Sequence, residues 1–145
     1  MNEGSEALKL TAVLDSNVII SGFAFARGNP AEILNLLRQG EIQVYISPFI
    51  FEEVTRVLRE GFHVDESDIE EVISFLHIHC IVIDPRLEAS VSGVSPSDNR
   101  VLDCAAQGGV QYLVTGDRAI QQLKDLQGVK IISPVDFLQV LRSTR

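Results

Sequence analysis

Short, nearly continuous runs of apolar residues constrain the fold of this chain more than any other feature of its sequence. The runs are rich in β-branched residues and do not alternate with polar ones, as is typical of parallel strands covered on both faces. They are residues 10–14, 43–46, 80–83, 112–114 and 130–132. The sequence therefore predicts a central parallel sheet of about five strands.

Segments with the apolar spacing of helices lie between these runs, at residues 30–38, 48–60, 68–77, 98–107, 118–123 and 134–141. Pro30 suits a first helical turn, and Ser47 and Ser67 are predicted N-caps, Ser67 with the spacing of a capping box. The Gly-Gly pair that ends at Gly109 predicts a helix stop. Strands and helices that alternate in this way predict an α/β fold, a three-layer α/β/α sandwich with right-handed crossovers.

The length of 145 residues, with 46% hydrophobic and 22% charged residues, is typical of one globular domain. We expect a single domain over residues 10–142, preceded by a flexible tail at residues 1–9. Residues 84–97 are rich in serine and contain two prolines, so we predict mainly a loop there. A loop of this length in a compact domain is often functional.

The cysteines and the N-terminus indicate a cytoplasmic protein. Cys80 and Cys104 lie in apolar runs without a repeated Cys-x-x-Cys spacing, which predicts buried, reduced thiols. The N-terminus lacks the apolar core of a signal peptide, and no stretch reaches the length of a membrane span. The net charge of −8 argues against tight, non-specific nucleic-acid binding, yet bound divalent ions can invert the sign of an acidic cleft.

Two aspartates follow predicted strands directly. Asp15 ends the first strand, and Asp117 follows the fourth strand through a glycine. Ligands of open parallel sheets bind beyond the carboxyl ends of the strands, so both residues are candidates for a site. Either one alone could equally be an N-cap of the helical segment that it precedes.

Helix geometry selects two further carboxylates. On the helix predicted at 48–60, Glu53 lies at the edge of the apolar stripe, whereas Glu52 points nearly opposite. A glutamate at such an edge either has a partner such as a metal or extends into water. Asp98 lies one turn before the apolar stripe of its helix, and Asp103 is rotated by roughly 140° from it and is expected to face away.

The segment HIHC could suggest zinc through His77, His79 and Cys80. No second ligand pair with a zinc-site spacing occurs elsewhere in the sequence. We therefore predict a helix end followed by a strand entry.

The chain resembles the PIN-domain family, and within it the prokaryotic, toxin-like (VapC-like) nucleases. The resemblance runs through VLDSNVIIS, SPFIFEEVTRVL, SDNRVLDCAAQGGVQYLVTGD and KIISPVDFL, from about Leu10 to Leu141. It implies that Asp15, Glu53, Asp98 and Asp117 form an acidic quartet. It also implies that Asn17 and Thr115 support the site, while Ser47 fits a helix cap better than a catalytic group.

Crowded carboxylates need protons or cations to neutralise them, and ligands that are all oxygen suit Mg²⁺ or Mn²⁺ better than zinc. We expect one or two such ions. By resemblance the activity is RNA hydrolysis that leaves a 5′-phosphate. Asp15 and Asp98 are expected to be the central ligands, Asp117 to complete the shell and Glu53 to hold the nucleophilic water or a second ion. The resemblance also implies a small antitoxin partner and a homodimer.

Basic residues flank the motif segments and are candidates for a substrate rim, each with a solvated ion pair as its ordinary alternative. They are Arg27, Arg56, Arg100 and Arg118.

Two other functions remain open from the sequence. The first is a PIN scaffold that binds RNA or protein without cutting it. The second is a receiver-like phosphoacceptor domain with Asp84 as acceptor, which is disfavoured because Asp15 has no acidic neighbour and Lys130 begins its strand.

Overall fold

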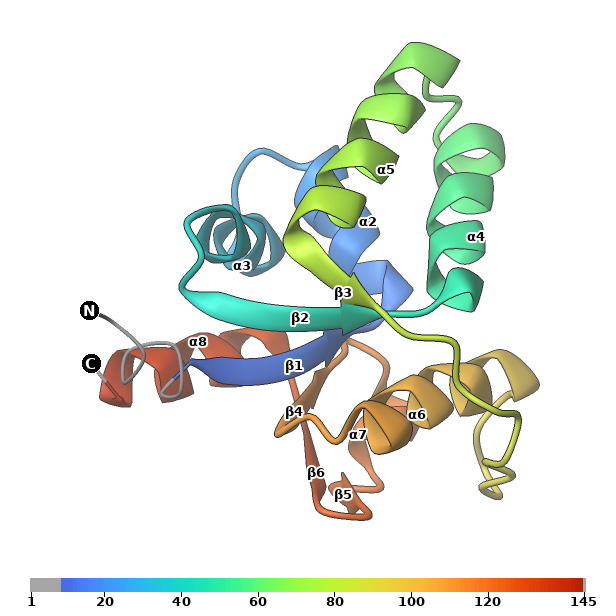
Figure 1. The fold of residues 1–145 in the computed structure, drawn as a ribbon, viewed down its shortest axis with the longest axis vertical. Helices are drawn as coiled ribbons and strands as arrows, with labels where there is room; N and C mark the ends of the chain where they lie inside the picture. The colour runs from blue at the N-terminus through green and yellow to red at the C-terminus, as the bar shows by residue number, and fades with distance from the viewer. Residues whose placement is uncertain (1–8, 145) are drawn as a thin grey trace.

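The computed structural model describes residues 9–144, which form one sheet of six strands in the order β3-β2-β1-β4-β6-β5 (Figure 1). Neighbouring strands are parallel except for β5 and β6, which are antiparallel. The strands are β1 (Leu10–Leu14), β2 (Ile42–Ile46), β3 (Cys80–Val82), β4 (Tyr112–Val114), β5 (Asp125–Leu126) and β6 (Val129–Ile132). The expected flexible tail at residues 1–9 lies almost wholly outside the described residues.

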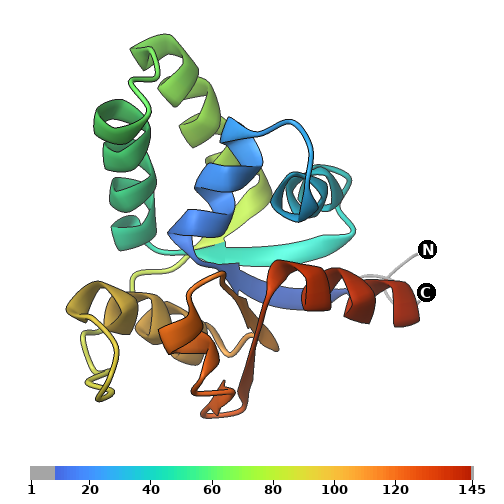
Figure 2. The same cartoon turned by 180° about the vertical axis from the view of Figure 1, so that it is seen from behind.

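Helices cover both faces of the sheet, which confirms the predicted α/β/α sandwich. Helix α6 lies on the near face in Figure 1, whereas α2 and α8 lie on the near face in the reverse view of Figure 2. The helices are α2 (Ser16–Ala24), α3 (Asn29–Arg38), α4 (Pro48–Arg56), α5 (Glu66–His79), α6 (Pro96–Gly108), α7 (Arg118–Gln121) and α8 (Pro134–Ser143). A π-helical turn, η1 (Val57–Gly61), continues α4.

Several helix ends follow the chemistry expected from the sequence. The Ser47 hydroxyl accepts a hydrogen bond from the backbone N–H of Ile50, and Gly109 ends α6 with a left-handed φ of 63°. The predicted cap at Ser67 is wrong, because α5 begins at Glu66, after Asp65. Two acidic residues in the first turn of α5 favour this earlier start through the helix dipole.

Two elements were not assigned from the sequence. The bounds of helix α2 do not follow from the sequence pattern, because its apolar residues show no clear one-sided stripe. Strand β5 has only two residues and pairs with β6 through a tight turn. Gln127 and Gly128 both have positive φ, as a type I′ hairpin turn requires.

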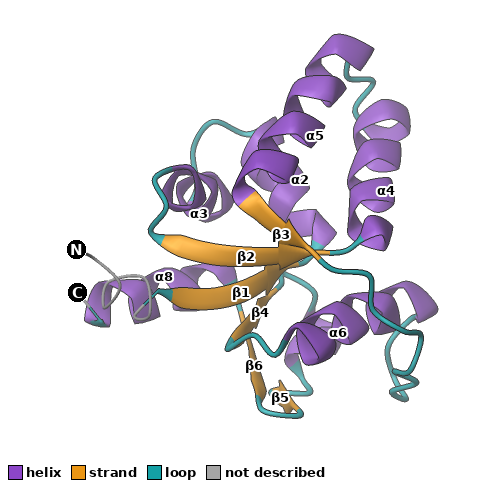
Figure 3. Ribbon diagram, viewed as in Figure 1, coloured by secondary structure: helices purple, strands orange, loops and turns teal. Residues whose placement is uncertain are grey.

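The core ends where polar residues begin, at the carboxyl edge of the sheet. Leu14, Ile46 and Val114 end β1, β2 and β4 and are buried, and Asp15, Ser47 and Thr115 follow them. The loop of residues 83–95 joins β3 to α6 on this side of the molecule (Figure 3). The carboxyl edge of the sheet is therefore polar and lies directly beside the apolar core. None of the described helices combines the length and the apolar character that crossing a bilayer requires.

Candidate active site at the carboxyl edge of the sheet

Asp15 is the most enclosed of the four predicted acids, with 5% of its surface exposed. Its Oδ1 atom accepts a hydrogen bond of 2.8 Å from the backbone N–H of Ser16. Its Oδ2 atom accepts one of 2.7 Å from the Thr115 hydroxyl and one of 3.3 Å from the Asn17 amide. The carboxylate of Asp15 is therefore fixed from both sides by polar groups of two segments.

The charges around Asp15 are unfavourable to its ionised form. The pKa of Asp15 is raised from 3.8 to about 6, with burial as the largest cause. The negative charges of Asp98 and Glu53 contribute to this rise, and the hydrogen bonds from Thr115 and Ser16 oppose it. Asp98 and Glu53 are thus both close enough for their charges to act on Asp15.

Glu53 reaches this site from α4. Its side chain is 21% exposed, and its Oε1 atom accepts a hydrogen bond from the Ser16 hydroxyl. Its Oε2 atom lies 4.0 Å from the Arg56 guanidinium, on the solvent side. Glu52 is exposed. The fold therefore brings Glu53, rather than Glu52, to the surroundings of Asp15.

Asp98 lies in the first turn of α6, where its backbone N–H donates to the Ser95 hydroxyl at 3.0 Å. The side chain is partly buried and its charge acts on Asp15. The helix begins at Pro96, two residues before the predicted start at Asp98, because Ser95 is its N-cap.

Asp117 is connected to Asp15 through Thr115. The backbone N–H of Asp117 donates to the Thr115 hydroxyl at 3.0 Å, and that hydroxyl donates to Asp15. One carboxylate oxygen of Asp117 accepts from the backbone N–H groups of Ala119 and Ile120 and caps α7. Asp117 is therefore the N-cap of α7, one of the two alternatives that its sequence position allows. Its other carboxylate oxygen does not take part in the cap.

The chemistry of these side chains fits a hard divalent cation, because the donors are carboxylate and hydroxyl oxygens around a buried carboxylate that like charges destabilise. Within residues 9–144, however, no three acidic, histidine or cysteine side chains are gathered closely enough to make a metal site as they stand. Metal binding therefore remains a proposal.

The four predicted rim arginines have different surroundings. Arg56 lies beside Glu53, and Arg118 is exposed directly after Asp117. Arg27 lies in the loop after α2, at the end of that helix remote from Asp15. Arg56 and Arg118 thus lie next to predicted acids, whereas Arg27 lies apart from Asp15.

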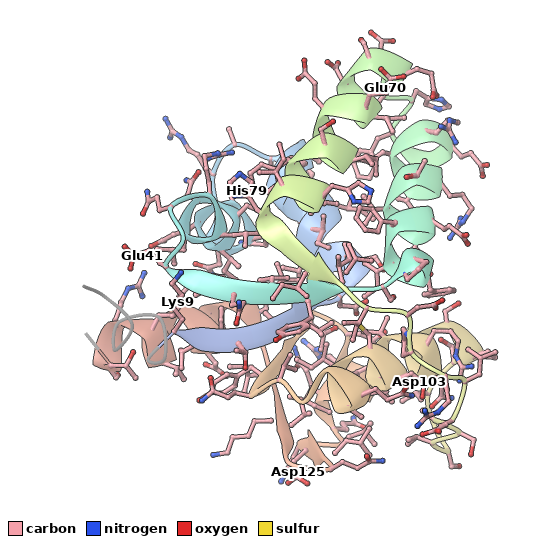
Figure 4. The ribbon with its side chains drawn as sticks, in the orientation of Figure 1. Lys9, Glu41, Glu70, His79, Asp103 and Asp125 are labelled. Carbon is pink, nitrogen blue, oxygen red and sulfur yellow. The ribbon has the colours of Figure 1, made fainter. Side chains whose placement is uncertain are left out.

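Arg100 is occupied by structural contacts instead. Its guanidinium lies 3.1 Å from the buried Asp103 carboxylate and donates to the carbonyl of Ala89 at 2.8 Å. Asp103 also accepts from the backbone N–H groups of Glu88 and Ala89. Figure 4 shows Asp103 on α6, and the loop of residues 83–95 passes it there. Asp103 thus faces away from Asp98, as predicted, and holds this loop.

The histidines of HIHC lie at the end of α5 and pack against rings. His77 stacks on Phe51 with a centroid distance of 4.4 Å, and His79 lies 4.6 Å from the Phe75 ring. Cys80 begins β3, and burial raises the pKa of its thiol to about 12. The predicted helix end and strand entry are confirmed.

An open groove of about 840 Å³ lies along α4, and Glu53 is the one predicted acid that lines it. Its other lining residues include Ser97 at the start of α6 and Ile73 and His77 of α5. Arg56 also lines it. The groove therefore leaves open space along α4 beside Glu53.

Ser16 is the site residue that sequence reasoning missed. It touches Asp15 through its backbone and Glu53 through its hydroxyl. Its adjacency to a strand-end aspartate was the one available signal. Without bounds for α2, its direction toward α4 could not be predicted.

Comparisons with known proteins agree with this architecture. The PIN domain family matches residues 11–119, which include all four predicted acids. A relative from Methanocaldococcus jannaschii, "Uncharacterized protein MJ1680", is 27% identical over 150 residues, covering 94% of this chain and 95% of the relative. A crystal structure of VapBC2 from Rickettsia felis, bound to a DNA fragment from their promoter, is similar in fold. Its TM-score is 0.56 at 14% identity, covering 86% of this chain and 98% of that one. With three quarters of its length matched, this chain belongs to the PIN domain family.

Proposed function

We propose that this protein is a Mg²⁺- or Mn²⁺-dependent ribonuclease that hydrolyses RNA phosphodiester bonds at the carboxylates of Asp15, Glu53, Asp98 and Asp117. The observation that carries the proposal is the buried Asp15 carboxylate, whose charge is opposed by Asp98 and Glu53. Such an arrangement gains stability when a cation binds, because the cation offsets both the burial and the repulsion.

Each acid has a role that follows from its contacts. Asp15 and Asp98 would bind the first ion, since Asp15 is fixed by hydrogen bonds and Asp98 acts on it electrostatically. Asp117 would complete the shell with the oxygen that does not cap α7, and Glu53 would hold the attacking water or a second ion. When bound, the cation supplies Lewis-acid polarisation of the phosphodiester and a lower pKa for the attacking water.

Asn17 and Thr115 would keep the Asp15 carboxylate in place during this chemistry. Both donate to the same oxygen, Oδ2, and thereby restrict its rotation. The groove along α4 would receive the RNA strand beside Glu53, with Arg56 and Arg118 as phosphate contacts at the rim. Because the net charge of the protein is −8, most of its surface repels RNA, and attraction is restricted to such rim residues. We therefore expect the protein to bind RNA weakly when the cation is absent.

We further propose that the protein is the toxin of a toxin–antitoxin pair, restrained by a small antitoxin and active as a homodimer in the cytoplasm. The resemblance of its motifs to toxin-like PIN proteins supports this role, as does the likeness of its fold to the VapBC2 structure. Expression of the chain should arrest growth, and co-expression of a small protein from a neighbouring gene should relieve the arrest.

The position of Asp84 in the fold argues against the receiver-like alternative. Asp84 is exposed beyond β3, the edge strand, and β2 separates that strand from β1 and Asp15. Asp84 therefore lies apart from the acid that a phosphoacceptor would need beside it.

The proposal is tested by incubating RNA with the protein in Mg²⁺, in Mn²⁺ and in EDTA. We expect cleavage with either cation, none with EDTA, and none from Asp15→Asn or Asp98→Asn. Asp84→Asn is the matched control, an exposed acid near the same sheet edge that should cleave like wild type. Equal behaviour of wild type, Asp15→Asn and Asp98→Asn would leave the binding scaffold as the better function.

A further inference from the structure

Ser16 connects two of the proposed metal-binding carboxylates. It is the first residue of α2 and is 5% exposed. Its backbone N–H donates to Asp15 at 2.8 Å, and its hydroxyl donates to Oε1 of Glu53, which lies on α4. One small residue therefore fixes a carboxylate on its own segment and another that is 37 positions away.

A helix-capping role does not account for this hydroxyl. The N-cap of α2 is Asp15, and the Ser16 side chain is directed across to α4 rather than to the backbone of its own helix. A buried hydroxyl usually has a hydrogen-bond partner, and here the partner is the carboxylate of a proposed ligand. The contact thus belongs to the site rather than to the start of the helix.

The charges explain why Glu53 needs such a donor. The negative charges of Asp15 and Glu53 repel each other across this site. Arg56 lies 4.0 Å from the other oxygen of Glu53, is 57% exposed and attracts that side chain toward solvent. A hydrogen bond to an ionised acceptor is among the stronger ones, so the Ser16 hydroxyl can oppose both effects.

We propose that Ser16 is a positioning residue, whose hydroxyl holds the Glu53 carboxylate toward Asp15 so that the two can share a divalent cation or the water bound to it. This inference rests on the proposed function. Ser16 itself takes no part in bond making or breaking, and it acts through the position of Glu53.

The first measurement is the affinity for Mn²⁺, by isothermal titration calorimetry on the full chain. We expect Ser16→Ala to weaken binding about tenfold, as the loss of an outer-shell hydrogen bond to a ligand typically does. Ser16→Thr retains the hydroxyl and should bind within about twofold of wild type. Ser21→Ala on the same helix is the matched control and should bind like wild type. Circular dichroism melts establish that each variant is folded.

The second measurement separates positioning from a general effect on the fold. In a double-mutant cycle, Ser16→Ala should weaken Mn²⁺ binding in the wild-type background but not in the Glu53→Gln background, because its effect passes through Glu53. Cleavage by Ser16→Ala should also recover at saturating Mn²⁺, since the lesion lies in cation binding.

The outcomes distinguish the two proposals. Equal weakening by Ser16→Ala in both backgrounds, or no rescue by Ser16→Thr, overturns the positioning role while leaving the nuclease proposal intact. If wild type neither binds Mn²⁺ nor cleaves RNA, the proposed function fails, and the role of Ser16 fails with it.

Discussion

Two aspartates of this protein are almost equally buried but have opposite surroundings. Asp103 is 2% exposed and faces the guanidinium of Arg100 at 3.1 Å, with two backbone N–H groups as further donors. Asp15 is 5% exposed and also accepts hydrogen bonds, but the charges that act on it are those of Asp98 and Glu53. The charge of Asp103 is therefore balanced by a nearby positive charge, whereas the charge of Asp15 is repelled by nearby negative charges.

The sign of the neighbouring charge therefore distinguishes these two carboxylates, where burial alone does not. A buried charge with a partner contributes to the fold, and its loss leaves the partner unpaired. A buried charge beside like charges is costly to the fold and is eased by a proton or a cation from solution. Each substitution below changes either Asp15 or the contacts made by Asp103 and its neighbouring loop.

The largest effect is expected on catalysis. Asp15→Asn should lower the single-turnover rate of RNA cleavage at saturating Mn²⁺ by at least about a thousandfold, since loss of the cation forfeits several kcal/mol of transition-state stabilisation. Asp103→Asn, measured below its melting temperature, should stay within about tenfold of wild type. A larger loss of rate in Asp103→Asn than in Asp15→Asn would reverse the assignment of the two residues.

The next effect is on stability, and it falls on Asp103. Asp103→Ala should lower the free energy of unfolding by about 3 kcal/mol, because it leaves Arg100 partly buried without its partner. Urea unfolding gives the value. Removing Arg100 as well, in Arg100→Ala/Asp103→Ala, should cost less than the sum of the single variants. Additive losses would show that the pair is not coupled.

The opposite sign is expected for Asp15 without metal. Its pKa is raised in the fold, so the stability that its protonated form contributes is fully present below pH 3.8 and is lost as pH rises through about 6. Asp15→Asn does not ionise and should be more stable than wild type by about 2 kcal/mol at pH 7.5 in EDTA. Urea unfolding should show this gain shrinking toward pH 4, and a gain independent of pH would contradict the cause.

The smallest effect concerns the loop that Asp103 holds. The Gln107 amide accepts from the backbone N–H of Arg86 at 2.8 Å and donates to its carbonyl at 2.7 Å. Gln107→Ala should cost about 1 kcal/mol and speed amide hydrogen exchange at Arg86, with Gln139→Ala on α8 as the exposed control. Unchanged exchange at Arg86 would show that the loop is held without Gln107.

The parts of the site predictable from the sequence are those set by local periodicity. Strand-end positions placed Asp15, and helix angles separated Glu53 from Glu52 and Asp98 from Asp103. The same angles could not show what Asp103 contacts, because the loop at Glu88 has no periodic pattern.

The contacts that escaped prediction join segments far apart in the chain. The Ser16 to Glu53 hydrogen bond depends on how α2 packs on α4, and the Thr115 to Asp15 bond crosses 100 positions of sequence. Strand β5 was missed for a different reason, since two residues carry too little pattern to identify a strand. Local rules thus describe the elements and their ends, and tertiary packing decides which polar groups meet.

The position of Thr115 after β4 sets when, during synthesis, its contacts with two other segments can form together. Thr115 donates from its backbone to Ile132 at the end of β6 and from its hydroxyl to Asp15, directly after β1. The two contacts therefore form together only after residue 132 has left the ribosome. A chain that ends before residue 132 lacks the strand that accepts from Thr115, so the Thr115 backbone N–H is left without this partner.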